Sequence, residues 1–133
     1  MRDIEDRGIG PVVEDAVAAA AAGTDAVYVT FDIDGVDPSV APGTGTPEPG
    51  GLTASQALTV METLGAHDAV GAADLMEVAP KYDASEGTQR LAAYLLVTLL
   101  NGSSRSPSPT AEDADSSDNT LRKHESASGA ERE

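Results

Sequence analysis

The stretch VYVTFDIDGVDP, residues 27 to 38, decides the fold class expected for this chain of 133 residues. It belongs to a continuous run of β-branched and aromatic residues, DAVYVTFDI, residues 25 to 33, which is typical of a strand buried on both faces of a parallel sheet. Two aspartates, Asp32 and Asp34, stand at alternate positions where the run ends. Because residues i and i+2 of a strand point the same way, both carboxylates are expected to address a common point while Ile33 turns into the core.

Helices are expected before and after this strand. Pro11 can open a helix that continues through PVVEDAVAAAAA, and Gly23 can close it. After the strand, residues 35 to 52 are crowded with Gly and Pro, so they can hold neither a helix nor a central strand, and a loop this long is usually functional. Thr53 then starts a second helix with the Thr-x-x-Gln spacing of a capping box. The apolar stripe of that helix, expected in the core, is Leu58, Met61 and Leu64.

The remaining folded part adds one more strand and one more helix. The second strand is expected within AVGAADLMEVAP and is stopped by Pro80, and Asp83 can cap a last helix that carries QRLAAYLLVTLL. Strands separated by helices predict an α/β fold, a three-layer α/β/α arrangement with a mainly parallel sheet. Two strands make a narrow sheet, so the chain is expected to be part of a larger one.

The composition changes after residue 101. Residues 102 to 133 are rich in Ser, Pro, Asp and Glu and offer almost nothing apolar to bury, so this acidic tail is expected to be disordered, with His124 solvated inside it. Residues 1 to 101 are expected to form one domain.

The net charge is −15, and the tail carries seven acids and four bases, so −12 remains on residues 1 to 101. Such a charge repels nucleic-acid phosphates and anionic membranes, so neither is expected as a partner. One interpretation is halophilic adaptation to a high-salt cytoplasm, and the other is an ordinary acidic surface. The chain has no cysteine, no signal-peptide pattern at its amino end and no apolar run of about 20 residues. A cytoplasmic protein is therefore expected.

Three carboxylates are expected to converge at one edge of the sheet. Asp32 and Asp34 end one strand and Glu77 ends the next, and the carboxyl ends of parallel strands collect reactive groups. Unneutralised carboxylates would raise each other's pKa, and a hard cation such as Mg²⁺ or Mn²⁺ removes that penalty. The structural alternative is that both aspartates are turn and cap residues. Asp37 is expected to tie the turn through its side chain, with no role in catalysis.

The same residues allow a second chemical interpretation. VTFDIDGV resembles the first motif of haloacid dehalogenase-like phosphatases, in which Asp32 would be the nucleophile and Asp34 the acid or base. In that family a Thr or Leu and a cap segment follow, whereas here Asp37 and Pro38 lead into a Pro-Gly loop. The later Lys motif is also hard to place, because Lys81 is a poor substitute for it.

A longer match favours another family. FDIDGVDPSVAPGTGTPEPGGLT closely resembles the C-terminal signature of the ureohydrolases, the arginase and agmatinase family, and the resemblance continues through MRDIEDRGIGPVVEDAV and DLMEVAPKYD. It covers essentially residues 1 to 101, and the loop wording is more like agmatinase than arginase. The resemblance implies an arginase-like α/β fold of which this chain is the C-terminal portion.

The resemblance also implies a chemistry. In this family a manganese pair binds a bridging hydroxide that attacks the guanidinium carbon, giving urea and an amine, as in polyamine biosynthesis from agmatine to putrescine. It places Asp32 and Asp34 among the metal ligands and Glu77 on the substrate guanidinium. Thr46 is a weaker substrate-binding candidate, for which a turn role between Gly45 and Pro47 is equally open. His67 is expected to be a surface or helix-cap residue at the opposite end of the sheet.

The chain departs from the family in one respect. The Gly-Gly-Asp-His-like and Asp-Ala-His-x-Asp-like segments that supply the histidines and further carboxylates do not occur in it. This fragment is therefore expected to be inactive alone, and no catalytic residue is assigned within it. Formimidoylglutamate or a guanidino acid is the alternative substrate, and a non-catalytic remnant or interaction domain is the alternative of another class. The family commonly forms homo-oligomers.

Overall fold

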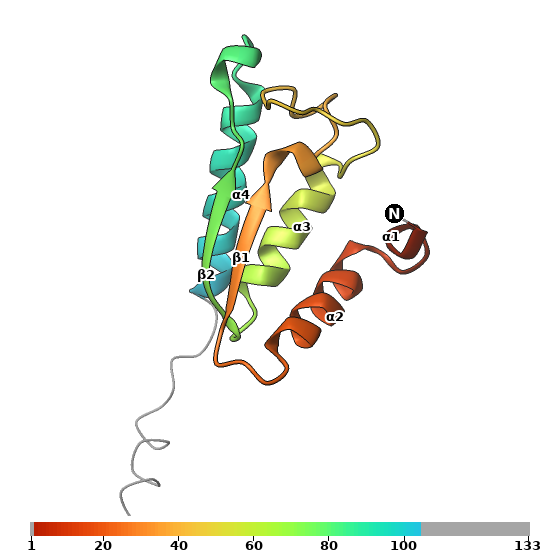
Figure 1. Ribbon diagram of the computed structural model, residues 1–133, viewed down its shortest axis with the longest axis vertical. Coiled ribbons are helices and arrows are strands. Elements are labelled where there is room, and N and C mark those ends of the chain that lie inside the picture. The colour runs from red at the N-terminus through yellow and green to blue at the C-terminus, as the bar shows by residue number, and fades with distance from the viewer. Residues whose placement is uncertain (1, 105–133) are drawn as a thin grey trace, which may run out of the picture.

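The computed structural model describes residues 2 to 104. Figure 1 shows two strands side by side, helices α3 and α4 against one face of them, and α2 alongside α3. In chain order the elements are α1 (Arg2–Arg7), α2 (Ile9–Ala21), β1 (Val27–Asp32), a 3-10 turn (Ile33–Gly35), α3 (Ala54–Gly65), β2 (Val70–Met76), a second 3-10 turn (Pro80–Tyr82) and α4 (Gly87–Ser103).

The two strands are parallel, as the alternation of strand and helix predicts. The register pairs Tyr28 with Ala72 and continues to Asp32 opposite Met76, with one irregularity between Val27 and Tyr28. Helix α3 lies between the strands in sequence and provides the crossover that a parallel pair requires. Both strands therefore end at the same edge of the sheet.

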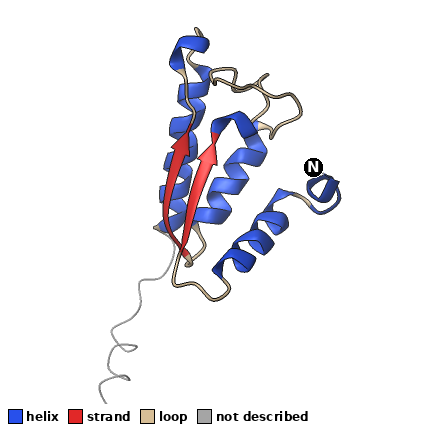
Figure 2. Cartoon of the chain, viewed as in Figure 1, coloured by secondary structure: helices blue, strands red, loops and turns tan. Residues whose placement is uncertain are grey.

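The sheet is covered on one face within the described residues (Figure 2). Val29, Phe31 and Leu75 pack against the core, whereas Tyr28 and Met76 on the opposite face are 62% and 47% exposed. Within residues 2 to 104 helices lie against one face of β1 only, which agrees with the expectation that the chain is part of a larger sheet, and burial of the second face stays a prediction. The α/β class with a parallel sheet is confirmed, and these residues carry one of the two helical layers that a three-layer arrangement needs.

The core lies between the sheet and the helices, and its centre is the contact of α3 with α4. Thr53 and Gln56 form the predicted capping box, with both reciprocal hydrogen bonds present. Met61 and Leu64 of the predicted stripe are buried, and Leu58 is partly buried and packs against the core. The members of the core are Val17, Ile33, Val36, Ala41, Ala57, Val60, Met61, Leu64, Ala92 and Leu95.

Glycines allow α3 and α4 to approach closely. A Cβ on Gly65 would lie 2.2 Å from the carbonyl oxygen of Leu99, and one on Gly102 would lie 2.8 Å from the carbonyl carbon of Gly65. No side chain fits at these two positions without separating the helices. Gly102 is buried inside α4, which continues through Ser103, although the composition places both residues in the tail.

Several element boundaries differ from the sequence expectation. Helix α2 begins at Ile9, so Pro11 lies in its first turn, where a missing N–H costs no intrahelical bond. Gly23 follows the end of this helix with a left-handed φ of 78°, in agreement with the predicted stop. Strand β2 ends at Met76, before Pro80, because Glu77 leaves the extended conformation. The short helix α1 is not expected from the sequence pattern.

Three further expectations concern membrane spans, the acidic tail and the charged surface. No helix among residues 2 to 104 is long and apolar enough to cross a membrane. The acidic tail and His124 lie outside the described residues. Among the described residues the ion pairs are Arg7 with Asp15 and Arg90 with Glu86, so most carboxylates there have no basic partner and the halophilic interpretation stays a prediction.

Candidate metal centre

The two aspartates lie at the carboxyl end of β1, but they belong to different elements of secondary structure. Asp32 is the last residue of the strand, whereas Asp34 lies in the 3-10 turn that follows. Asp32 caps this turn, since its Oδ1 accepts a 3.1 Å hydrogen bond from the amide of Asp34. The prediction that both carboxylates share one strand face is therefore wrong, while the prediction that Ile33 turns into the core is confirmed by its complete burial.

The loop of residues 36 to 52 is closed at its base. The amide of Asp37 donates to the carbonyl of Leu52 at 2.9 Å, and the amide of Leu52 donates to the carbonyl of Gly35 at 2.8 Å. Gly51 permits this contact, because a Cβ there would lie 2.7 Å from both the Gly35 oxygen and the Asp37 nitrogen. Such a closed loop is a compact unit that holds its own residues in place.

Asp37 ties the loop from inside, as predicted. Its Oδ1 accepts hydrogen bonds from the hydroxyl and the amide of Ser39, and its Oδ2 accepts a 2.9 Å bond from the amide of Gly50. The bond from the Ser39 hydroxyl, followed by the backbone amides, lowers the pKa of Asp37 below its ordinary value. The ionised carboxylate therefore joins the two ends of the loop.

Thr46 connects this loop to the turn that carries Asp34. Its exposed hydroxyl donates a 2.7 Å hydrogen bond to Oδ2 of Asp34. The bond orients that carboxylate, and among residues 2 to 104 no hydrogen bond occupies its Oδ1. The structure thus gives Thr46 more than the turn role, and its contact with a substrate stays a prediction.

Glu77 lies directly after β2 and is exposed. Since Met76 pairs with Asp32, Glu77 is at the same edge of the sheet as both aspartates, as expected. Its φ of 64° is left-handed, a strained conformation for a residue with a long side chain. Strain of this kind clusters at functional positions.

The segment after Glu77 is joined to the loop that carries Thr46. The amide of Ala79 donates a 2.7 Å hydrogen bond to the carbonyl of Gly43. Gly43 in turn contacts Thr88 at the start of α4. The sequence pattern did not identify Thr88, although the Asp-x-Ser-x-x-Thr spacing from Asp83 is a signal of side-chain capping that could have found it.

The ligand atoms at this site are of the type that binds a hard divalent cation, but there are too few of them. Asp32 and Asp34 offer carboxylate oxygens, which suit Mn²⁺, yet two side chains cannot fill the roughly six positions that each ion prefers. Among residues 2 to 104 no group of three or more His, Cys, Asp or Glu side chains is placed to hold a metal. The described residues therefore form at most part of a metal site.

His67 does not add to this site. It precedes β2, at the amino end of the strands, and its Nδ1 accepts a 3.2 Å hydrogen bond from the amide of Ala69. The C-cap residue of α3 is Ala66, so His67 lies one residue beyond the predicted helix-cap position and is half-buried. The length of the strands separates it from Asp32, which ends β1, and from Asp34, which lies in the turn that follows.

Known proteins of similar sequence carry the names agmatinase and guanidinobutyrase. The agmatinase of Chromobacterium violaceum is 58% identical over 74 residues, which are 56% of this chain and 23% of that protein. The guanidinobutyrase of Pseudomonas aeruginosa is 51% identical over the same length, and an agmatinase of Escherichia coli is 45% identical over 97 residues, 73% of this chain and 31% of that protein. The chain thus spans about a quarter to a third of these relatives.

Solved structures of similar fold carry related names. Arginase from Bacillus caldovelox superposes with a TM-score of 0.69 at 36% identity, covering 74% of this chain and 33% of that one. Formimidoylglutamase from Bacillus subtilis superposes with a TM-score of 0.74 at 30% identity, covering 79% of this chain and 33% of that one. The family model described as "Arginase family" matches residues 1 to 101. Because that match covers most of the sequence, the chain belongs to the arginase family.

Proposed function

We propose that this chain contributes two metal-ligating aspartates and a guanidinium-binding glutamate to a manganese-dependent hydrolase of linear amidines, with agmatine as substrate and putrescine and urea as products. The observation that carries the proposal is the hydrogen bond from Thr46 to Asp34 at the carboxyl end of β1. It orients one oxygen of a carboxylate and leaves the other open, beside a second carboxylate, in a member of the arginase family.

The aspartates have the chemistry that manganese requires. Asp32 uses Oδ1 on the amide of Asp34, and Asp34 uses Oδ2 on the hydroxyl of Thr46, so each retains an oxygen for a cation. A bound manganese pair supplies Lewis acidity and an activated water near neutral pH. The closed loop keeps the open oxygen of Asp34 from rotating away.

Glu77 has the chemistry that a guanidinium requires. A planar carboxylate accepts two parallel, charge-assisted hydrogen bonds from a planar guanidinium, which fixes both the distance and the orientation of the carbon to be attacked. The left-handed backbone of Glu77 supports this role, because strain persists where the surroundings impose it for function.

The remaining ligands must come from outside the described residues. The relatives are three to four times longer than the stretch that matches them, which leaves room for histidines and carboxylates that residues 2 to 104 do not supply. We propose that the fragment alone is inactive for this reason.

A second candidate substrate is a guanidino or formimidoyl acid. It is supported by the TM-score of 0.74 with a formimidoylglutamase and by the identity of 51% with a guanidinobutyrase. The product distinguishes the two kinds of substrate. Formimidoylglutamate gives formamide, whereas a guanidino compound gives urea.

A chimera tests the proposal. The stretch of this chain that matches the Escherichia coli agmatinase over 97 residues replaces the matching segment of that protein. Urea and formamide are then measured with agmatine, 4-guanidinobutyrate and formimidoylglutamate, with and without Mn²⁺. The expected result is manganese-dependent urea release from agmatine that Asp34→Asn abolishes. Asp25→Asn is the matched control, because Asp25 is exposed ahead of β1. A folded chimera that releases neither product from any substrate contradicts the proposal and favours a non-catalytic domain.

A further inference from the structure

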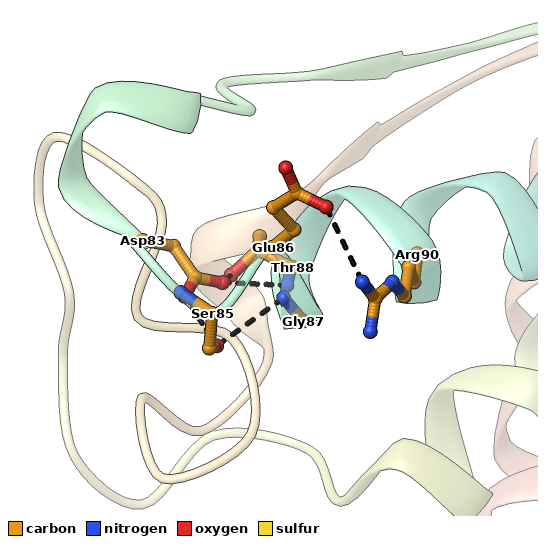
Figure 3. Close-up of polar contacts among 6 residues, drawn as sticks. All are labelled: Asp83, Ser85, Glu86, Gly87, Thr88 and Arg90. Carbon is orange, nitrogen blue, oxygen red and sulfur yellow. Dashed lines mark hydrogen bonds and ion pairs between the residues drawn. The ribbon is translucent and has the colours of Figure 1, made fainter.

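A buried carboxylate stands at the start of α4, away from the candidate metal ligands. Asp83 is 4% exposed and accepts four hydrogen bonds. Its Oδ1 accepts from the amide and the hydroxyl of Ser85 at 3.0 and 2.6 Å, and its Oδ2 accepts from the amide and the hydroxyl of Thr88 at 2.7 and 2.8 Å. Figure 3 shows Asp83 reaching across the first turn of the helix to Thr88. The predicted cap is therefore present, although the N-cap residue itself is Glu86.

Thr88 connects Asp83 to the loop of residues 36 to 52. Its hydroxyl is completely buried and accepts a 2.8 Å hydrogen bond from the amide of Gly43. The hydroxyl has a single hydrogen, which is directed at Asp83, so an oxygen lone pair faces Gly43. Hydrogen bonds from Ser85 and Thr88 hold the pKa of Asp83 well below its usual range, which keeps this carboxylate an acceptor at neutral pH.

Gly43 is held from both sides. Its amide is bound to Thr88, and its carbonyl accepts the 2.7 Å hydrogen bond from Ala79. A Cβ on Gly43 would lie 2.8 Å from both the Cβ of Asp83 and the Oγ1 of Thr88, so the backbone packs directly on this pair. Gly43 precedes Thr46 by three residues, and Ala79 follows Glu77 by two. One network thus joins the two segments that carry the candidate site.

We propose that Asp83 is a positioning residue, which acts through Thr88 and Gly43 to fix the loop carrying Thr46 relative to the segment carrying Glu77. Its ionised carboxylate orients the Thr88 hydroxyl, the hydroxyl holds the Gly43 amide, and the Gly43 carbonyl holds Ala79. The consequence for catalysis rests on the proposed function, whereas the positioning of the loop does not.

Amide hydrogen exchange in the full chain tests the positioning directly. In Thr88→Val, which keeps the shape and removes the hydroxyl, the amides of Gly43 and Ala79 are expected to exchange roughly fivefold to tenfold faster, while those of Met61 and Leu95 in the core change less. Asp83→Asn is expected to act in the same direction. Thr88→Ser keeps the hydroxyl and is expected to restore slow exchange.

The matched control is Thr98→Val in the same helix, because the hydroxyl of Thr98 donates to the carbonyl of Tyr94 one turn earlier in α4. It is expected to leave the Gly43 amide unchanged. An unchanged Gly43 amide in Thr88→Val, or equal acceleration of Gly43, Met61 and Leu95, overturns the proposal, because a purely structural contact changes all core amides together.

The chimera provides the catalytic readout. Thr88→Val is expected to raise the KM for agmatine roughly tenfold, since a displaced Glu77 segment weakens the grip on the guanidinium. A change in the folded fraction alone lowers apparent kcat and leaves KM unchanged, and that result contradicts a role in substrate positioning. An inactive parent chimera refutes the proposed function, and the exchange result then still decides whether Asp83 positions the loop.

Discussion

The hydroxyl of Thr46 donates a 2.7 Å hydrogen bond to Oδ2 of Asp34, across a loop of Gly and Pro that separates the two residues by twelve positions. A carboxylate at the end of a strand is free to rotate about its side-chain bonds. The bond to Thr46 fixes that rotation, and the closed base of the loop fixes Thr46. A metal ligand needs this kind of support, because outer contacts set the direction of its oxygen.

Replacing Thr46 with Val is therefore expected to lower kcat/KM of the chimera about tenfold to a hundredfold, the range for losing a hydrogen bond to a charged group. Thr46→Ser keeps the hydroxyl and is expected to retain most of the activity. Steady-state urea release at saturating Mn²⁺ provides the measurement. Equal activity of Thr46→Val and the parent would show that Asp34 needs no such support.

Replacing Glu77 with Gly is expected to preserve stability and to abolish activity. Its left-handed backbone costs about 1 to 2 kcal/mol for a residue with a Cβ, and Gly adopts that conformation freely. Glu77→Gly is expected to unfold at the same or a slightly higher temperature while urea release by the chimera is lost.

The control for Glu77 is Glu86→Gly, since Glu86 is also exposed and has a φ of 59°. Its ion pair with Arg90 is on the surface and contributes little. This variant is expected to match the thermal behaviour of Glu77→Gly and to keep full activity. Loss of activity in both variants would assign the effect to the backbone and not to the Glu77 carboxylate.

The close contact at the base of the loop predicts a cost for any side chain at Gly51. A Cβ there meets the backbone of Gly35 and Asp37 at 2.7 Å, and backbone cannot move aside as a flexible side chain can. Gly51→Ala is expected to lower the free energy of unfolding by about 1 to 3 kcal/mol. Gly45→Ala, where nothing lies within 4 Å, is expected to change it by less than about 0.5 kcal/mol. Denaturant titration of the full chain measures both.

Part of this architecture follows from local sequence, and part does not. The Thr53 and Gln56 capping box is a pattern within four residues, and the parallel strands follow from the alternation of elements, so both were predictable. The hydrogen bond between Gly43 and Thr88 joins residues 45 positions apart, and no local pattern encodes such a pairing.

The candidate site divides in the same way. The sequence places Asp32, Asp34 and Glu77 at one edge of the sheet because strand ends are predictable. It does not predict that the strand ends at Asp32 and that Asp34 lies in a turn. The turn forms there because the side chain of Asp32 accepts a hydrogen bond from the amide of Asp34 and so caps it. The left-handed backbone of Glu77 is also absent from the sequence pattern, because it contradicts the preference of the residue.

The low pKa of Asp83 gives an acid dependence with a definite sign. Because its pKa in the folded state lies below the ordinary value of 3.8, the stability it contributes is fully present above that pH and is lost as the pH falls below it. Asp83→Asn is expected to unfold at lower denaturant concentration than the parent at about pH 7, and the difference is expected to shrink toward about pH 3. Asp25→Asn provides the control. A difference that grows as the pH falls would reverse the assigned sign.

The manganese content of the purified chimera tests the central claim most directly, because it reports on the ligands and not on the whole catalytic cycle. After dialysis against metal-free buffer, the parent chimera and the Asp25→Asn control are expected to retain a manganese pair per chain. Asp32→Asn and Asp34→Asn are each expected to retain less metal while remaining folded by circular dichroism. Full manganese content in both aspartate variants would contradict the account, since neither residue would then be a ligand.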